Sequence, residues 1–135
     1  MLTGARRMGA AIADRLTAQG ASVVVTYRGS SVEADAVVAA ARARGVDGLA
    51  LQGDVADAAS VAQMVEAVDA RFGRLDVLVN MASVYEAVPF DSMTEADWHR
   101  SLSVDLHGTF RMCHAAVPLM RRGGGGRIIN FSDWV

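Results

Sequence analysis

The feature that most constrains the fold of this chain is a regular alternation between strand-like and helix-like apolar patterns. Residues 22–27, Ser-Val-Val-Val-Thr-Tyr, form a β-branched run typical of a strand that is covered on both faces. Further short apolar runs lie at 48–52, 75–79 and 127–132, and helical patterns lie at 8–19, 32–44 and 58–72. Strands separated by helices of this length indicate right-handed β-α-β crossovers and a parallel sheet with helices on both faces.

The longest helical pattern covers residues 95–121. Its large apolar side chains recur at spacings of 4, 4, 3, 4 and 3, which is the period of one helix face. They are Leu102, Leu106, Phe110, Cys113, Val117 and Met120. We therefore expect one continuous helix that turns this set of residues toward the core.

The bulk properties of the sequence exclude several classes of protein. A length of 135 residues suits one domain, so we treat residues 1–135 as a single domain. The net charge of −2 gives no general attraction for nucleic acid. No apolar run approaches the ~18 residues needed to span a bilayer, and the first residues lack the apolar segment of a secretory signal. We expect a cytoplasmic protein with no nucleic-acid or membrane partner.

The cysteine, histidine and lysine content is also informative. Cys113 is the only cysteine, which excludes an internal disulfide. Two interpretations are open for His99, His107 and His114 on the long helix, a metal site or ordinary surface positions, and we expect the second, with no metal. All 13 basic residues are arginines, so the given sequence contains no lysine.

Ligands of open parallel sheets bind where the strands end. The first such place is Thr3-Gly4-Ala5-Arg6-Arg7-Met8-Gly9, a glycine-containing turn that opens directly into a helix. In such a turn, backbone N–H groups can approach a pyrophosphate at the positive end of the helix dipole. Only two of the three glycines of the usual pattern are present. A simple tight turn therefore remains the alternative to dinucleotide binding.

The residues after the second strand bear on the choice of nucleotide. The strand ends at Tyr27-Arg28-Gly29-Ser30, where an NAD-binding domain usually carries an acid for the ribose 2′-hydroxyl. Here no carboxylate occurs before Glu33. A guanidinium matches a phosphate in geometry and in charge, so Arg28 and Ser30 favour NADP(H). A solvated loop arginine is the alternative interpretation.

Polar residues follow the next two strands, at Gly53-Asp54-Val55 and Asn80-Met81-Ala82-Ser83. Each alone could be ordinary turn chemistry, but their order along the chain is more specific. Together with the glycine turn and two later motifs, these residues resemble the short-chain dehydrogenase/reductase family over essentially the whole chain. The two later motifs are Val104-Asp105-Leu106-His107-Gly108 and Gly126-Arg127-Ile128-Ile129-Asn130-Phe131-Ser132-Asp133. The resemblance implies an α/β fold, a Rossmann-type doubly wound parallel sheet that binds a dinucleotide.

The resemblance assigns roles to the motif residues. Asp54 would hydrogen-bond the adenine with Val55 packed nearby, and Asn80 and Ala82 would line the ribose and nicotinamide side. Arg7 and Arg28 would hold phosphates. The remaining expected coenzyme contacts are Gly4, Arg6, Gly9, Ser30 and Ser83.

Some motif details look like the pteridine-reductase branch of this family. They are the arginine in the glycine turn, Ala82-Ser83 in place of Ala-Gly, and an aspartate, Asp133, where a catalytic serine usually stands. By this resemblance Asp133 assists proton delivery and Tyr85 stacks on the substrate. Asp105 stands where the family has an asparagine that organises a relay water, and it could hold that water as a charged acceptor.

The family's catalytic Tyr-x-x-x-Lys pair does not occur in these residues, so the general acid and its ammonium partner are missing. Only Met1-Leu2 remain of the first strand, and the last two strands of the family sheet are absent. We therefore expect the incomplete N-terminal half of a longer protein, inactive as an isolated chain.

Two functions follow. The first is an NADP(H)-dependent oxidoreductase that transfers hydride to a small carbonyl or pterin-like substrate and is a homo-oligomer, dimer or tetramer, when full length. The alternative is a non-catalytic nucleotide-binding or interaction chain. A flavodoxin-like or receiver domain shares the architecture but would need a phosphate-binding or acidic cluster after the first strand, which the sequence lacks.

Overall fold

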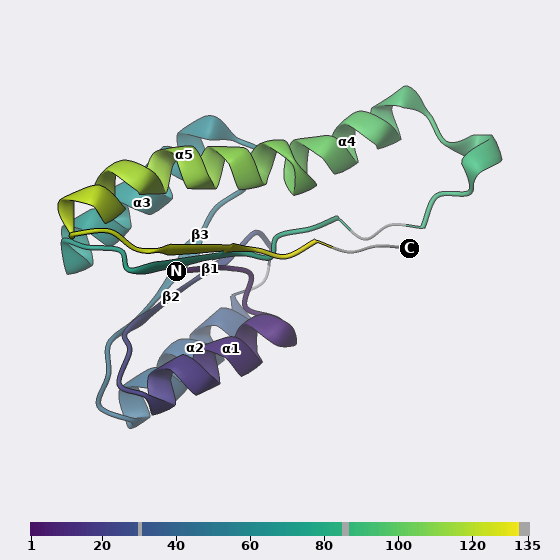
Figure 1. Cartoon of the computed structure of the whole chain (residues 1–135). Coiled ribbons are helices and arrows are strands. Elements are labelled where there is room, and N and C mark those ends of the chain that lie inside the picture. Colours follow the sequence, from purple (N-terminus) through teal and green to yellow (C-terminus); the bar gives the residue numbers. More distant parts are fainter. Residues whose placement is uncertain (30, 85–86, 133–135) are drawn as a thin grey trace.

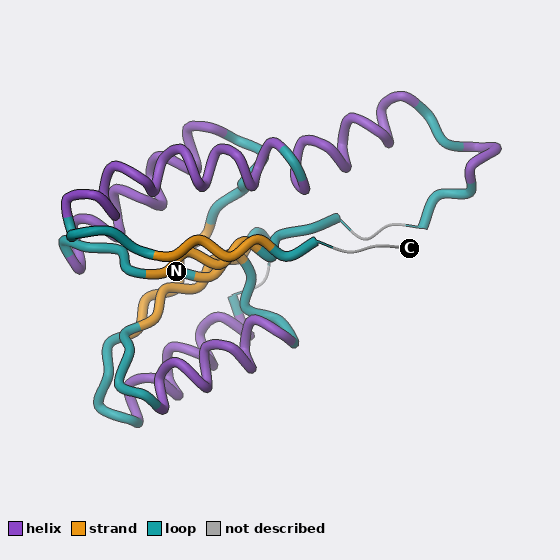
Figure 2. Tube along the Cα trace, in the orientation of Figure 1, coloured by secondary structure: helices purple, strands orange, loops and turns teal. Residues whose placement is uncertain are grey.

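Five parallel strands form the centre of the fold (Figures 1 and 2). The computed structural model describes residues 1–29, 31–84 and 87–132. The strands lie in the order β3-β2-β1-β4-β5. They are β1 (Leu2–Thr3), β2 (Val23–Tyr27), β3 (Gly48–Gln52), β4 (Val77–Asn80) and β5 (Arg127–Asn130). The predicted Rossmann-type parallel sheet is thus confirmed.

The helices cover both faces of this sheet. In Figure 1, α1 (Met8–Ala18) and α2 (Val32–Ala43) lie below the strands, and α3 (Ala58–Phe72) and α5 (His107–Arg122) lie above them. Each face has its own apolar core. Leu2, Val25 and Val79 pack toward the core that includes Ala13 and Val38 of α1 and α2. The opposite core joins β4 to α3 and α5 through residues such as Leu78, Val65 and Met112.

The first strand is short but central. Leu2 pairs with Val25 on one side and with Val79 on the other. The α-amino group of Met1 donates to the Val77 carbonyl at 2.7 Å, and Val79 N–H donates to the Met1 carbonyl at 2.9 Å. Burial lowers the pKa of this amino group to about 6, against an opposing effect of the Asp76 charge. The sheet is therefore continuous from β2 through β1 to β4, because even two strand residues bridge their neighbours.

The strand order reverses between β1 and β4. The chain builds outward from β1 to β2 and β3 and then crosses to β4 on the other side of β1. At such a reversal the connections leave in opposite directions, which opens a crevice beyond the carboxyl ends of the strands. The topology therefore places the most favourable ligand position beside the residues that follow β1 and β4.

Most predicted boundaries agree with the structure within one or two residues, and the fourth strand shows the largest shift. It was expected at residues 75–79 and is observed at Val77–Asn80. Leu75 is buried but precedes the strand, and the Asp76 carboxylate lies 2.6 Å from Arg74 in an ion pair. Burial of Leu75 was therefore a correct expectation, whereas its inclusion in the strand was wrong.

The predicted long helix is divided in two at Leu106. α4 (Glu95–Asp105) ends there and α5 begins at His107. The Thr109 hydroxyl donates to the Asp105 carbonyl at 2.9 Å, and the Arg111 guanidinium donates to the Ser103 carbonyl at 3.3 Å. Side chains that bond to helix carbonyls compete with the backbone ladder and bend the helix, which accounts for the break.

The expected core-facing side of this helix is right only in part, because Met120 is buried and Cys113 packs against the core, but other members of the set are exposed. Leu106 and Phe110 are 58% and 65% exposed, whereas Gly108, Met112 and Ala116 are buried. A Cβ atom built on Gly108 would lie 2.6 Å from Cγ2 of Val55. Gly108 thus lets α5 pass close to Val55 in the turn after β3, while Met112, Leu119 and Met120 bury large side chains in the core. Leu106 and Phe110 lie on another face of the helix.

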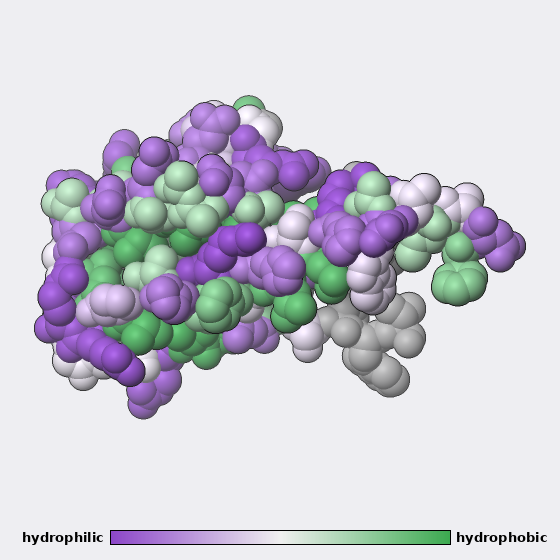
Figure 3. All heavy atoms as spheres, turned by 90° about the horizontal axis from the view of Figure 1, so that it is seen from above, coloured by the Kyte–Doolittle hydropathy of each residue, from purple (hydrophilic) through white to green (hydrophobic). Residues whose placement is uncertain are grey.

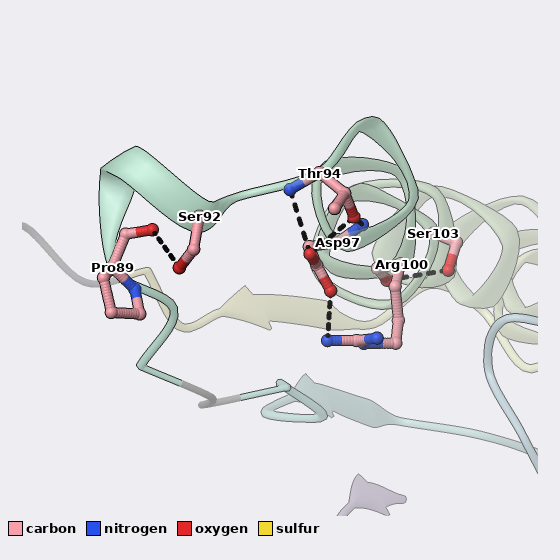
Figure 4. A network of polar contacts seen from close by, with 6 residues as sticks. All are labelled: Pro89, Ser92, Thr94, Asp97, Arg100 and Ser103. Carbon is pink, nitrogen blue, oxygen red and sulfur yellow. Dashed lines mark hydrogen bonds and ion pairs between the residues drawn. The ribbon is translucent and has the colours of Figure 1, made fainter.

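The start of α4 is fixed by a capping box, shown in Figure 4. The Thr94 hydroxyl accepts from Asp97 N–H at 3.2 Å, and the Asp97 carboxylate accepts from Thr94 N–H at 3.0 Å. The Asp97 carboxylate also lies 3.0 Å from Arg100. The hydrogen bonds from Thr94, aided by Arg100, lower the pKa of Asp97. This cap orients the segment of η1 (Phe90–Ser92) and α4, which projects from the body in Figure 3.

Candidate functional site

A pocket of about 730 Å³ lies at the carboxyl ends of the strands. Its walls come from the turn between β1 and α1, the ends of β2 and β3, the first turn of α2 and the segment after β4. Among the expected coenzyme contacts, the lining includes Gly4, Arg6, Arg7, Gly9, Arg28, Asp54, Val55, Ala82 and Ser83. Segments more than 70 residues apart in the sequence thus meet at one site, at the position where the strand order reverses.

The turn after β1 is shaped by close backbone contact. A Cβ atom on Gly9 would lie 2.1 Å from the carbonyl oxygen of Gly4, so no other residue fits there without displacement of the turn. Gly4 has a φ of +132°, a conformation that L side chains rarely adopt. The sequence therefore has glycine at the two positions of this turn where the backbone conformation demands it.

Arg7 lies at the amino terminus of α1 in an unusual conformation. Its φ of 42° is the only positive value for a non-glycine among the described residues. Arg7 occupies the N-cap position, but its side chain makes no capping hydrogen bond to the helix. A helix amino terminus carries partial positive charge and N–H groups that an anion can accept. Together with the guanidinium groups of Arg6 and Arg7, this end of the pocket favours an anionic ligand.

Thr3 connects the two segments that flank the strand reversal. Its hydroxyl oxygen accepts from the N–H groups of Met81 and Ala82, at 2.8 and 3.0 Å. Thr3 is 1% exposed. This residue was quoted in the glycine-turn motif but not expected to have a role of its own. Its contribution depends on contacts across 78 positions of sequence, which no local pattern reveals.

The pocket contains both signs of charge. The Arg6 guanidinium lies 3.3 Å from the Glu33 carboxylate, and both side chains line the pocket. Arg28 is exposed at the end of β2, where its carbonyl accepts from Gln52 at 3.1 Å. One oxygen of Asp54 accepts from Ala56 N–H at 2.8 Å, which fixes the carboxylate at the pocket wall.

Two expected site residues lie apart from this lining. Asn80 is buried, and its amide donates to the Asn130 side chain at 2.8 Å and to Cys113 Sγ at 3.4 Å. The Asp105 carboxylate accepts from Val84 N–H at 3.1 Å, and Asp105 is exposed. Asn80 therefore fastens β4 to β5, and Asp105 holds the segment after β4. Neither residue belongs to the pocket lining that the structure describes.

Three further expected residues, Ser30, Tyr85 and Asp133, lie outside the described residues. Within the described ranges, no group of His, Cys, Asp and Glu side chains is arranged to hold a metal ion. Among the helices described, none is both long and apolar enough to cross a membrane.

The model of the family described as short chain dehydrogenase matches residues 1–133. The chain belongs to this family. It is 41% identical over 136 residues to the 3-oxoacyl-(acyl-carrier-protein) reductase of Staphylococcus aureus strain Mu50, a match that covers 100% of the chain and 55% of that relative. The chain thus spans about half the length of this short-chain dehydrogenase relative.

Solved structures of the family agree with the fold. A short chain dehydrogenase from Burkholderia cenocepacia J2315 in complex with NADP superposes with a TM-score of 0.87 at 38% identity, over 96% of this chain and 52% of that one. An NAD⁺-bound xylitol dehydrogenase also has a TM-score of 0.87, at 28% identity over 96% of this chain and 50% of its own. These two neighbours bind different nicotinamide nucleotides.

The expectation of a pteridine-reductase-like branch is not supported. The Staphylococcus aureus relative, which matches along the whole chain, is a 3-oxoacyl-(acyl-carrier-protein) reductase. The branch was inferred from single residues, and one of these, Asp133, lies outside the described part of the chain, as does Tyr85, the substrate contact that the branch implied. Membership of the short-chain dehydrogenase family is shown, whereas the pteridine-reductase branch, inferred from isolated substitutions, is not.

Proposed function

We propose that this chain is the coenzyme-binding part of an NADP(H)-dependent oxidoreductase that reduces a small carbonyl substrate. The observation that carries the proposal is the convergence of Arg6, Arg7 and Arg28 with the Gly4–Gly9 turn in one pocket at the strand reversal. A dinucleotide carries its pyrophosphate and, in NADP(H), a further phosphate. The donors on this side of the pocket therefore suit the charge of the ligand.

The fit of a coenzyme rests on the shape of the turn. Because Gly9 has no side chain, the turn can fold so that the Gly4 carbonyl packs against it, which fixes the backbone at the start of α1. The N–H groups of this helix terminus would hold a ligand phosphate. Arg28 would hold the additional phosphate of NADP(H), and Asp54 would contact the adenine. Ala82 and Ser83, anchored through Thr3, would line the side on which the nicotinamide binds. When bound, this coenzyme supplies the hydride.

A carbonyl substrate is the choice that the similarity favours. The relative from Staphylococcus aureus is named as a reductase of a 3-oxoacyl group, which is a carbonyl reduction. The exposed apolar side chains of Leu106 and Phe110 support a further part of the proposal, that the full-length protein is a homo-oligomer with α4 and α5 near the subunit contact. Burial of such side chains is a common driving force for association.

Arg28 offers a direct test of nucleotide choice. In the Arg28→Asp variant, a carboxylate would repel the 2′-phosphate and accept from a free ribose hydroxyl. We expect NADPH to bind at least ~10-fold more weakly, a change of about 1.4 kcal/mol, and NADH to bind equally or better. Fluorescence titration of the reduced nucleotides measures both. An unchanged preference would assign the discrimination to another residue.

The isolated chain is expected to bind NADPH without oxidising it. Its two tyrosines, Tyr27 and Tyr85, are followed four positions later by Ser31 and Pro89, so no Tyr-x-x-x-Lys pair occurs in these residues. Without a positioned proton donor, carbonyl reduction loses its general acid. The same observation favours the second candidate function, a nucleotide-binding chain without catalysis. Sustained NADPH oxidation by the purified 135-residue chain with a ketone substrate would contradict this expectation.

A further inference from the structure

Arg6 and Glu33, which both line the pocket, form an ion pair. Arg6 belongs to the turn after β1, and Glu33 belongs to the first turn of α2. Their charged groups are 3.3 Å apart, and their side chains are 79% and 42% exposed. Because the two residues come from different elements, the pair bridges the glycine turn and α2 at the place where Arg28 also lines the pocket.

Glu33 brings negative charge into an anion-binding site. The lining contains the three guanidinium groups of Arg6, Arg7 and Arg28, and Glu33 is the carboxylate that lies against one of them. A phosphate that enters beside Arg28 must either compete with Glu33 for Arg6 or bind close to the Glu33 charge. Both alternatives weaken the binding of a phosphate, since like charges repel and a paired guanidinium has fewer free donors.

We propose that Glu33 is a specificity-determining residue that limits the preference of this pocket for a 2′-phosphate by holding Arg6. The inference rests on the proposed nucleotide function. Glu33 would leave a nucleotide without the additional phosphate almost unaffected, because that ligand presents only hydroxyl groups to this side. The pocket therefore tolerates both nicotinamide nucleotides more evenly than its arginine content suggests.

The test compares two probes that differ in one phosphate, adenosine 2′,5′-bisphosphate and adenosine 5′-monophosphate. In the Glu33→Gln variant we expect the bisphosphate to bind about threefold to fivefold more tightly, in line with the upper range of exposed ion pairs. The monophosphate should change by less than about twofold. Isothermal titration calorimetry at low salt measures both affinities, and the gain should shrink as salt screens the charges.

Asp35→Asn is the matched control. Asp35 lies in the same first turn of α2 and carries the same charge, but it is exposed and is not among the pocket residues described. A general effect of charge at the helix amino terminus would appear in both variants. We expect the bisphosphate affinity of Asp35→Asn to equal that of the unmodified chain.

The possible results distinguish a failure of the proposed Glu33 role from a failure of nucleotide binding. Equal tightening of both nucleotides in Glu33→Gln, or no tightening, would overturn the role of Glu33 while leaving nucleotide binding intact. The same gain in an Arg6→Gln background would overturn the part played by the ion pair. If the unmodified chain binds neither probe, the proposed function fails, and the inference about Glu33 fails with it.

Discussion

Replacement of Gly9 by alanine should weaken NADPH binding by at least ~100-fold, a loss of about 2.7 kcal/mol. The new Cβ atom would lie 2.1 Å from the Gly4 carbonyl oxygen and 2.9 Å from its carbon, and both are backbone atoms that cannot rotate away. The turn must therefore open, which moves the start of α1 and displaces its N–H groups from the phosphate position. Forced overpacking of this kind also costs about 1–3 kcal/mol of folding stability.

Gly123→Ala provides the control for this experiment. Gly123 lies at the end of α5 and is not among the described residues that line the pocket, and a Cβ atom there would meet its nearest neighbours at 3.5 Å, an ordinary contact. We expect unchanged NADPH affinity and nearly unchanged stability. Fluorescence titration and urea denaturation should be run on both variants. Normal NADPH binding by a folded Gly9→Ala chain would show that the turn does not hold the coenzyme.

The second large effect is expected for Thr3→Val. Valine keeps the shape of the side chain but removes the oxygen that accepts from Met81 and Ala82 N–H. A fully buried donor left without an acceptor costs about 1–3 kcal/mol. Because the Met81 and Ala82 donors are part-buried, we expect the lower part of this range for each, a total loss of about 2–4 kcal/mol in the free energy of unfolding. The segment after β4 should also lose its fixed position at the pocket wall, which weakens coenzyme binding.

Amide hydrogen exchange locates this second effect. Met81 and Ala82 should exchange much faster in Thr3→Val than amides of β3, which Thr3 does not contact. Thr3→Ser keeps the hydroxyl group and should restore most of the protection, at the cost of one methyl group, about 1 kcal/mol. Retained protection of Met81 and Ala82 in the valine variant would contradict the assigned role of Thr3.

Local sequence patterns were sufficient for most elements of the fold, although not for the division of the long helix at Leu106. The β-branched run at Val23–Tyr27 and the helix of Ala58–Phe72 are determined by neighbouring residues, so their type and extent follow from the sequence. The ends of the strands identified the pocket for the same reason, because parallel strands bring their carboxyl ends to one edge. Gly4, Arg7, Arg28 and Asp54 accordingly meet in one pocket.

What the sequence could not predict depends on contacts between distant segments. The close approach of α5 at Gly108 to Val55, 53 positions earlier in the sequence, does not follow from the period of the apolar residues. The role of Thr3 depends on the register of β1 against β4. The motif predicts that Asn80 lines the coenzyme site. Its side chain instead donates to Asn130, because the two residues pair across β4 and β5.

The central claim is that a nicotinamide nucleotide binds where the strands end at the β1–β4 reversal. A titration of the ¹⁵N-labelled chain with NADPH, followed by NMR, tests it residue by residue. The account predicts saturable shifts in the amides of the Gly4–Gly9 turn, Arg28, Asp54 and the segment 81–84. The cavity at the opposite end of the strands, near Ser22 and Asp76, should be unaffected. Shifts confined to that cavity, or no saturable shifts at all, would contradict the account.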